Sequence, residues 1–149
     1  VGSDQDVLNR FHQLLSDAVA KRLRSDVPLG ALLSGGTDSS LVCAIANDQL
    51  NGKLKTFNIG FDDKQYDESN YANRVAKILK TDHHTFQLSS EEAIQYMDEY
   101  LIHFDEPFAD TSAIPTLLVS KKTREQVTVA LTGDGGDELF LGYGSHQWA

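Results

Sequence analysis

Short apolar segments alternate with helical patterns along nearly the whole sequence, and this alternation restricts the possible folds more than any other feature. Four short apolar runs are typical of buried strands, and they cover residues 28–34, 54–61, 82–89 and 126–132. Helical spacing of apolar residues predicts helices over 5–24, 38–50, 68–79, about 94–104, about 115–123 and from 133 onward. Strands that alternate with helices in this way predict an α/β fold, a parallel sheet with helices on both faces.

The helix expected near residue 94 has a clear start signal. It follows the capping pattern Ser89-Ser90-Glu91-Glu92. Its apolar residues then form one stripe at helical spacing: Ile94, Met97, Leu101 and Phe104. This combination is typical of an amphipathic helix.

The spatial order of the strands follows from their connections. Right-handed crossovers between parallel strands predict the order 3-2-1-4. The first strand then lies between the second and the fourth, and ligands of open α/β sheets bind at the carboxyl ends of the strands where the order reverses. We therefore expect the loops after strands one and four, residues 34–40 and 132–138, to flank one crevice.

The loop at residues 34–40 reads Ser-Gly-Gly-Thr-Asp-Ser-Ser, between the first strand and the next helix. Glycines let backbone N–H groups approach an anion, hydroxyls donate to it, and the helix N-terminus adds partial positive charge. An ordinary capped strand–turn–helix explains one hydroxyl and one glycine of the cluster, but not all of it. Asp38 would repel an anion unless a cation lies between them, which indicates Mg²⁺ bridging its carboxylate and phosphate oxygens.

Two better-known phosphate loops do not fit this sequence. Gly30 and Gly35 have the spacing of a Walker A motif, but Gly36-Thr37 stands where that motif requires Lys-Ser/Thr. The stretch "GDGGDE" does not match G-x-G-x-x-G, because Glu138 takes the place of the third glycine. The sequence therefore gives little support to a kinase-like or dinucleotide-binding site.

The second loop carries three acids in five residues after the fourth strand. A glycine-rich turn before a helix would explain Asp137 and Glu138 through the helix dipole alone. If the two loops flank one crevice, Asp38 and Asp137 could instead bind one Mg²⁺ ion or a pair of ions from opposite sides.

Composition and charge exclude several classes of partner. The formal net charge is −9, with acids spread along the chain, so nucleic acid is a poor partner. Cys43 is the only cysteine, which excludes a disulfide framework and predicts a small buried hydrophobe. No apolar run approaches the length of a membrane span and no signal peptide is present, so we expect a cytoplasmic location and no membrane partner.

Residues 34–40 resemble the pyrophosphate loop of the ATP pyrophosphatases, S-G-G-x-D-S. Both loops together, with "TFNIGFDDKQYDESNYANRVAKILKTDHHTFQLS" and "DEPFADTSAIPTLLVSKKTREQVTVALTGDGGDELFLGYG", resemble the synthetase domain of glutamine-hydrolysing asparagine synthetases. The resemblance implies an adenine nucleotide alpha hydrolase-like fold and a ligase that uses ATP and Mg²⁺. It implies that aspartate attacks ATP, that β-aspartyl-AMP and pyrophosphate form, and that ammonia displaces AMP to give asparagine.

The resemblance also assigns expected roles to single residues. Asp38 and Asp137 match the magnesium-binding aspartates, and Asp134 stands where enterobacterial-type members have a glutamate near the acyl-adenylate and ammonia. That replacement shortens the side chain by one methylene, so a catalytic role for Asp134 is an expectation only. The nucleotide-binding positions are, for the pyrophosphate, Ser34, Gly35, Gly36, Asp38, Ser39 and Ser40; for adenine, the backbone of Leu32 and Ile59; and a nucleotide-contacting pair, Thr132 and Gly133.

Two parts of that family are not among these 149 residues. A glutaminase domain with an N-terminal cysteine nucleophile is expected before Val1, and a lysine that neutralises the reacting phosphates after Ala149. We therefore expect residues 1–149 to form a single, truncated synthetase domain that binds ATP and synthesises no amide by itself.

Three alternatives remain at this point. A paralogue could amidate another carboxylate with the same machinery. A tRNA-modifying or thiolating pyrophosphatase is disfavoured by the acidic surface and the lack of a cysteine pair. A non-catalytic module that binds adenine nucleotides needs the anion loop but not two magnesium carboxylates, so Asp137 and Asp134 favour the enzyme.

Other polar residues have plainer explanations. His83 and His84 are neighbours on a strand and face opposite sides, so they cannot chelate one ion together. Asp62 and Asp63 fit a solvated loop. Asp105-Glu106-Pro107 lies near the ligand edge and is a weaker candidate for contact with the acceptor substrate.

Overall fold

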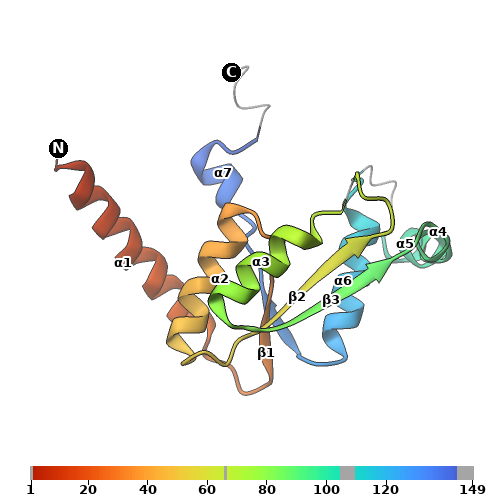
Figure 1. Cartoon of the computed structure of the whole chain (residues 1–149), viewed down its shortest axis with the longest axis horizontal. Coiled ribbons are helices and arrows are strands. Elements are labelled where there is room, and N and C mark those ends of the chain that lie inside the picture. Colours follow the sequence, from red (N-terminus) through yellow and green to blue (C-terminus); the bar gives the residue numbers. More distant parts are fainter. Residues whose placement is uncertain (1, 66, 105–109, 144–149) are drawn as a thin grey trace.

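The computed structural model describes residues 2–65, 67–104 and 110–143, and these form three layers with a sheet in the middle (Figure 1). All strand pairs are parallel, in the order β3-β2-β1-β4, which confirms the predicted fold class and strand order. The strands are β1 (Leu29–Leu32), β2 (Lys55–Phe61), β3 (Asp82–Leu88) and β4 (Val129–Leu131). Within the described residues β1 is central, as the expected crevice requires.

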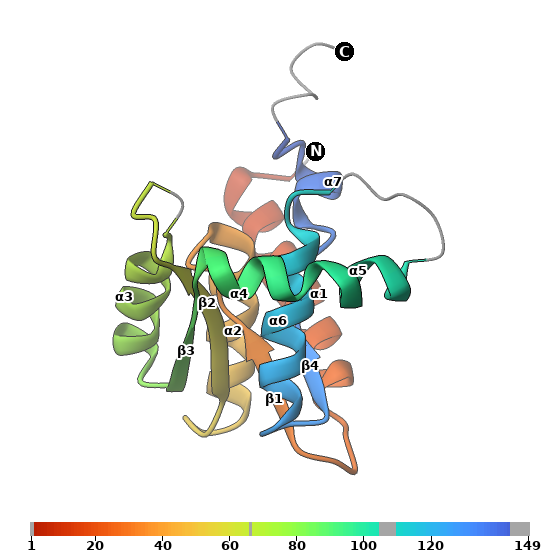
Figure 2. The ribbon, with the colours of Figure 1, turned by 90° about the vertical axis from the view of Figure 1, so that its right-hand side faces the viewer.

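Helices cover both faces of the sheet, as predicted. Helices α1, α2 and α3 lie on one face, and α4, α5 and α6 on the other, while α7 lies beyond the carboxyl end of β4 (Figures 1 and 2). Their bounds are α1 (Asp4–Arg22), α2 (Thr37–Gln49), α3 (Ser69–Leu79), α4 (Ser90–Gln95), α5 (Met97–His103), α6 (Ala113–Arg124) and α7 (Gly136–Phe140). No helix in the described ranges has both the length and the apolar character needed to cross a bilayer.

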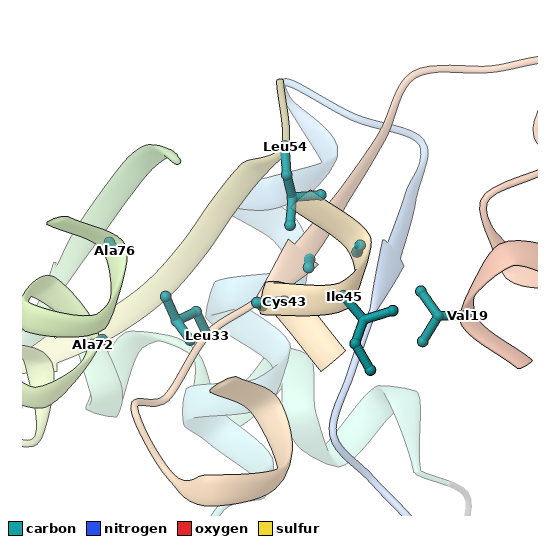
Figure 3. Close-up of a cluster of buried hydrophobic side chains, with 9 residues drawn as sticks. Val19, Leu33, Cys43, Ile45, Leu54, Ala72 and Ala76 are labelled. Atoms are coloured by element: carbon teal, nitrogen blue, oxygen red, sulfur yellow. The ribbon is translucent and has the colours of Figure 1, made fainter. Parts of the chain in front are cut away.

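The main core lies between β1 and helices α1, α2 and α3 (Figure 3). Small residues let α2 approach the sheet closely, since Ala31, Cys43 and Ala46 are completely buried. Cys43 is thus the buried hydrophobe that its sequence context predicted. Burial raises the pKa of its thiol to about 12, so the thiol stays protonated and unreactive at neutral pH.

The opposite face is covered mainly by α6. Leu118 and Val119 are buried there, and Phe57 of β2 is fully buried on this side because side chains alternate along a strand. The Phe57 ring stacks with His84 at 5.5 Å and with Phe86 at 6.1 Å between ring centroids. This face therefore holds β2 and β3 together beneath α6.

The segment after β3 begins as predicted and then differs from the prediction. The capping box forms: the Ser89 N–H donates to Glu92 Oε2 and the Glu92 N–H donates to Ser89 Oγ, both at 3.1 Å. The expected single helix is divided at Tyr96 into α4 and α5. Much of the apolar stripe faces outward: Ile94 is 72% exposed and Leu101 58%. Tyr100, at the edge of that stripe and in ring contact with Phe104, is the buried residue of α5.

Candidate functional site

A cavity of about 650 Å³ opens at the carboxyl ends of β1 and β4, between the loops that follow these strands. We call it the loop cavity. Residues 34 and 36–39 line one side and residues 132–134, 136 and 137 the other. The two loops thus flank one crevice, as the strand order predicted.

The first loop is organised by its own hydroxyl groups. Ser34 Oγ and Ser39 Oγ lie 2.9 Å apart, and the backbone N–H of Ser34 donates to Ser39 Oγ at 3.3 Å. The N–H of Gly36 donates to Ser34 Oγ at 3.3 Å. Ser39 is buried, so its hydroxyl shapes the loop from inside as well as lining the cavity.

The loop leads directly into α2. No side chain caps this helix at Gly36, and its first residues, Thr37 to Ser39, line the loop cavity. Uncapped N–H groups and the helix dipole favour an anion at this position. The cavity therefore has the polarity that a phosphate group requires on its α2 side.

The two glycines of the first loop have different roles. Gly35 has a φ of +88°, and a Cβ on it would lie 2.5 Å from the backbone nitrogen of Ala72. This glycine lets the loop pack against the start of α3, and it lines none of the described cavities. Gly36 is exposed and lines the loop cavity, so it is the glycine placed for contact with an anion. Ser40 Oγ is buried, has no partner among the described residues and lines none of these cavities.

The second loop packs tightly on the first. A Cβ on Gly133 would lie 2.6 Å from the Ser39 backbone nitrogen, and one on Gly136 would overlap the Asp38 carboxylate. The side chain of Asp38 thus lies directly against the backbone of the second loop. This contact brings the two sequence motifs together at atomic range.

Three carboxylates line the loop cavity, those of Asp38, Asp134 and Asp137. No Lys, Arg or His is among the described residues that line it. Across the described ranges, no three His, Cys, Asp or Glu side chains converge closely enough to hold a metal by themselves. Mg²⁺ commonly takes one or two protein carboxylates and completes its shell with substrate phosphates and water, so Asp38 and Asp137 fit it.

A smaller cavity of about 220 Å³ adjoins the loop cavity at the ends of β1 and β2, and we call it the strand-end cavity. Leu32 and Ser34 line both cavities, and Phe57, Ile59 and Val119 make the smaller one largely apolar. A small apolar group fits such a cavity, and substituents on it can reach the adjoining loop cavity.

Residues of α6 complete the loop cavity, and our sequence analysis did not identify them. Thr116 and Ser120 are one helical turn apart and both line it. The sequence does show that these two hydroxyl residues share one face of the expected helix, because they are four residues apart. It does not show that this face of the helix meets the site.

Two further cavities surround the site. The α6 groove, of about 690 Å³, runs along α6 beside α5 and β4, with Glu99, Lys121 and Thr128 in its lining. A cavity of about 900 Å³ at the ends of β2 and β3 includes Asp62 and Asp63. The loop containing these two acids follows β2 at the ligand edge of the sheet, and it borders this cavity.

The paired histidines lie apart from these cavities. His83 Nδ1 is 2.8 Å from the Thr56 hydroxyl on one face of the sheet. His84 lies on the other face, where its ring stacks with that of Phe57. Burial lowers the pKa of His83, so it is neutral at pH 7. Asp105-Glu106-Pro107, the weaker acceptor candidate, lies outside the described residues.

The chain is similar to several known proteins. A family model described as asparagine synthase matches residues 10–149. A putative glutamine-hydrolysing asparagine synthetase of Methanocaldococcus jannaschii is 48% identical over 135 residues, which are 90% of this chain and 26% of that protein. Asparagine synthetase 1 of Bacillus subtilis, also named as glutamine-hydrolysing, is 38% identical over 148 residues, 99% of this chain and 23% of that protein. The chain thus spans about a quarter of the length of these relatives.

Among solved structures, the chain is similar to an NH3-dependent NAD synthetase of Campylobacter jejuni. The TM-score is 0.57 with 17% sequence identity, over 91% of this chain and 60% of that one. This similarity supports the fold, and at this identity it carries nothing about the substrate.

Proposed function

The chain belongs to the asparagine synthase family, and from this premise we propose that it forms the ATP-binding part of an AMP-forming amide ligase. The observation that carries the proposal is the meeting of loops 34–39 and 132–137 around one cavity that contains three carboxylates. A site that binds an anion without a metal ion would need cationic side chains beside Asp38, Asp134 and Asp137. None is among the described lining residues.

The cavities suggest how ATP is bound. The adenine fits the strand-end cavity against the backbone of Leu32 and Ile59. The β- and γ-phosphates then lie in the loop cavity, at the uncapped first turn of α2 and beside Gly36. Thr132 and Gly133 border the nucleotide from the second loop, and Ser34 lines both cavities.

Asp38 and Asp137 would hold Mg²⁺ between the protein and the phosphates. The ion supplies positive charge against the phosphate oxygens, which the described lining residues do not provide. Asp134 is exposed and lines the same cavity as these two aspartates, where it can orient the incoming ammonia or the acyl group. Ser34 and Ser39 keep the first loop in one conformation through their mutual hydrogen bond.

The reaction then follows from this placement. A carboxylate oxygen of the acceptor bonds to the α-phosphorus, and the bond from that phosphorus to the pyrophosphate oxygen breaks. Ammonia next attacks the acyl carbon, AMP leaves with the bonding electron pair, and the extra proton passes to water or to a carboxylate. We propose aspartate as the acceptor, since the relatives are named as asparagine synthetases.

Further parts belong to the same proposal. Ammonia would come from glutamine through a glutaminase domain elsewhere in the complete polypeptide, because the relatives are named glutamine-hydrolysing and the chain spans a quarter of their length. Residues 1–149 would be part of one synthetase domain, and a charge-neutralising lysine would come from another part of it. We place this activity in the cytoplasm, where ATP and Mg²⁺ are available.

Two other functions make different predictions. A paralogue that amidates another carboxylate would show the same nucleotide chemistry with a different acceptor. A non-catalytic nucleotide-binding module would bind Mg-ATP without exchanging pyrophosphate. The conjunction of three carboxylates in the loop cavity favours the enzyme over the module.

The test is exchange of radiolabelled pyrophosphate into ATP by the complete gene product, with and without aspartate. We expect aspartate-dependent exchange that falls at least about a hundredfold in Asp38→Asn and in Asp137→Asn, with weaker Mg-dependent ATP binding in both. Asp48→Asn is the matched control, because Asp48 lies on the same helix as Asp38, is exposed and lines none of the described cavities. Full exchange in either cavity variant would contradict the proposed metal site.

A further inference from the structure

The walls between the cavities are formed by a small group of residues on β1, α6 and the second loop. Leu32, Thr116, Ser120 and Thr132 line both the loop cavity and the α6 groove. Thr116 also lines the large cavity at the ends of β2 and β3. Thr116 is therefore where three cavities meet.

The hydroxyls of Thr116 and Ser120 are available to a ligand. Both residues are exposed, and no hydrogen bond joins either hydroxyl to another residue in the described ranges. The helix that carries them is firmly held, because Leu118 and Val119 are buried against the sheet and Lys121 binds Glu99 of α5 at 2.7 Å. The two donors are thus presented by a rigid element.

The polarity of the loop cavity makes such donors valuable. No cationic side chain is among its described lining residues, and the hydroxyls of Ser34 and Ser39 already bond to each other. Thr132 Oγ1 accepts a hydrogen bond from the Asp134 N–H at 3.4 Å. On the α6 side, Thr116 and Ser120 supply the side-chain donors.

The direction of attack on ATP assigns these donors a partner. In nucleotidyl transfer, the attacking oxygen and the leaving pyrophosphate lie roughly in line through the phosphorus. If pyrophosphate lies at the first turn of α2, the acceptor must approach from the opposite side. The α6 wall of the loop cavity includes Thr116 and Ser120, and the α6 groove continues beyond them.

We propose that the α6 groove is the binding site of the acceptor substrate, and that Thr116 and Ser120 hold its reacting carboxylate by donating hydrogen bonds to it. The proposal rests on the proposed function, since it needs ATP in the loop cavity. The ligand class is a carboxylic acid with a body small enough for a groove of about 690 Å³. Hydrogen bonds of this kind fix the carboxylate oxygen near the phosphorus before the bond forms.

The test uses the complete gene product with the variants Thr116→Val, Ser120→Ala and their double variant. Valine keeps the branched shape of threonine, so the loss is that of the hydroxyl alone. Pyrophosphate exchange is measured against acceptor concentration, first with aspartate and then with a panel of other amino acids and dicarboxylates. Mg-ATP affinity is measured separately by calorimetry without acceptor.

We expect KM for the acceptor to rise about tenfold in each single variant and on the order of a hundredfold in the double variant. Mg-ATP affinity should stay within about twofold of the unaltered protein. Thr116→Ser should restore most of the acceptor KM, because it restores the donor. Ser16→Ala is the matched control, a helical serine of α1 that lines none of the described cavities, and it should change neither quantity.

Three results would overturn the inference. An unchanged acceptor KM in the double variant would show that the hydroxyls do not hold the carboxylate. A matching loss of Mg-ATP affinity would show that they hold the nucleotide instead. An unaltered protein that exchanges pyrophosphate with no carboxylate of the panel would refute the proposed function itself and this inference with it. The first two outcomes leave the proposed function standing, so the two failures are distinguishable.

Discussion

The two glycine-rich loops face one cavity but are supported very differently. The first loop joins strand β1, which pairs with β2 and β4, to the 13-residue helix α2. Cys43 and Ala46 of α2 are completely buried. The second joins the three-residue strand β4 to the five-residue helix α7, in which no residue is buried. The first loop is therefore preorganised by the core, whereas the second depends on its contacts with the first.

This difference explains why the binding geometry is concentrated at the first loop. A phosphate site gains affinity when its donors are already in position, because less order has to be imposed on binding. The second loop brings Asp134 and Asp137, and its position relies on the close approach of Gly133 to Ser39 and of Gly136 to Asp38. Substitutions that separate folding from binding test this difference between the two loops.

The largest expected effect is at Gly35. Gly35→Ala adds a Cβ at a φ of +88° and 2.5 Å from the Ala72 nitrogen, so both backbone strain and overlap with α3 oppose folding. We expect a loss of about 3 kcal/mol in the free energy of unfolding, measured by urea denaturation. Gly52→Ala is the control, because Gly52 has a φ of +76° with no atom within 4 Å of the added Cβ. It should cost about 1 kcal/mol, and equal losses in both variants would contradict the packing role of Gly35.

The intermediate effect is at Gly133. Gly133→Ala should push the second loop away from Ser39, because the new Cβ would lie 2.6 Å from that backbone nitrogen. We expect Mg-ATP binding to weaken by about tenfold while the free energy of unfolding falls by only about 1 kcal/mol, since β4 and α7 contribute little buried surface. Calorimetric titration and urea denaturation measure the two quantities.

The exposed residue Leu139 of α7 provides the control for Gly133→Ala. Leu139→Ala removes a side chain that is 76% exposed and should leave both quantities nearly unchanged. If Gly133→Ala lowered the free energy of unfolding as much as Gly35→Ala does, the second loop would be as firmly packed as the first, and the proposed difference would be wrong.

The smallest expected effect concerns Tyr143, just after α7. Its hydroxyl donates to Glu138 Oε1 at 2.7 Å, and this bond, with the charges of Glu138, Asp137 and Asp134, raises the pKa of Tyr143. A raised pKa in the folded state means that the contribution to stability is complete below pH 10 and declines as the pH rises through the folded pKa. The Tyr143 side chain is exposed to solvent, so we expect a small decline. Urea denaturation between pH 8 and 11 should show a shallower decline in Tyr143→Phe, and identical pH profiles would exclude the interaction.

Local patterns predicted much of this molecule. The capping box at Ser89, the burial of Cys43 and the order of strands could be read from a few neighbouring residues and from the handedness of crossovers. The same local reasoning placed both glycines of the first loop against an anion. Only Gly36 lines the loop cavity, while Gly35 packs on α3.

Short-range sequence patterns were sufficient to predict the fold class, the strand order and the two loops that meet at the carboxyl edge of the sheet. These follow from periodicity, turn residues and connection rules, which act over short stretches of chain. The packing of the folded chain was needed to show that the stripe with Ile94 and Leu101 faces outward, and that Thr116 and Ser120 of α6 face the loop cavity. A helix pattern shows which residues share a face, but it does not show what covers that face. The covering of a helix face depends on contacts between segments far apart in the chain, such as the approach of Gly133 to Ser39.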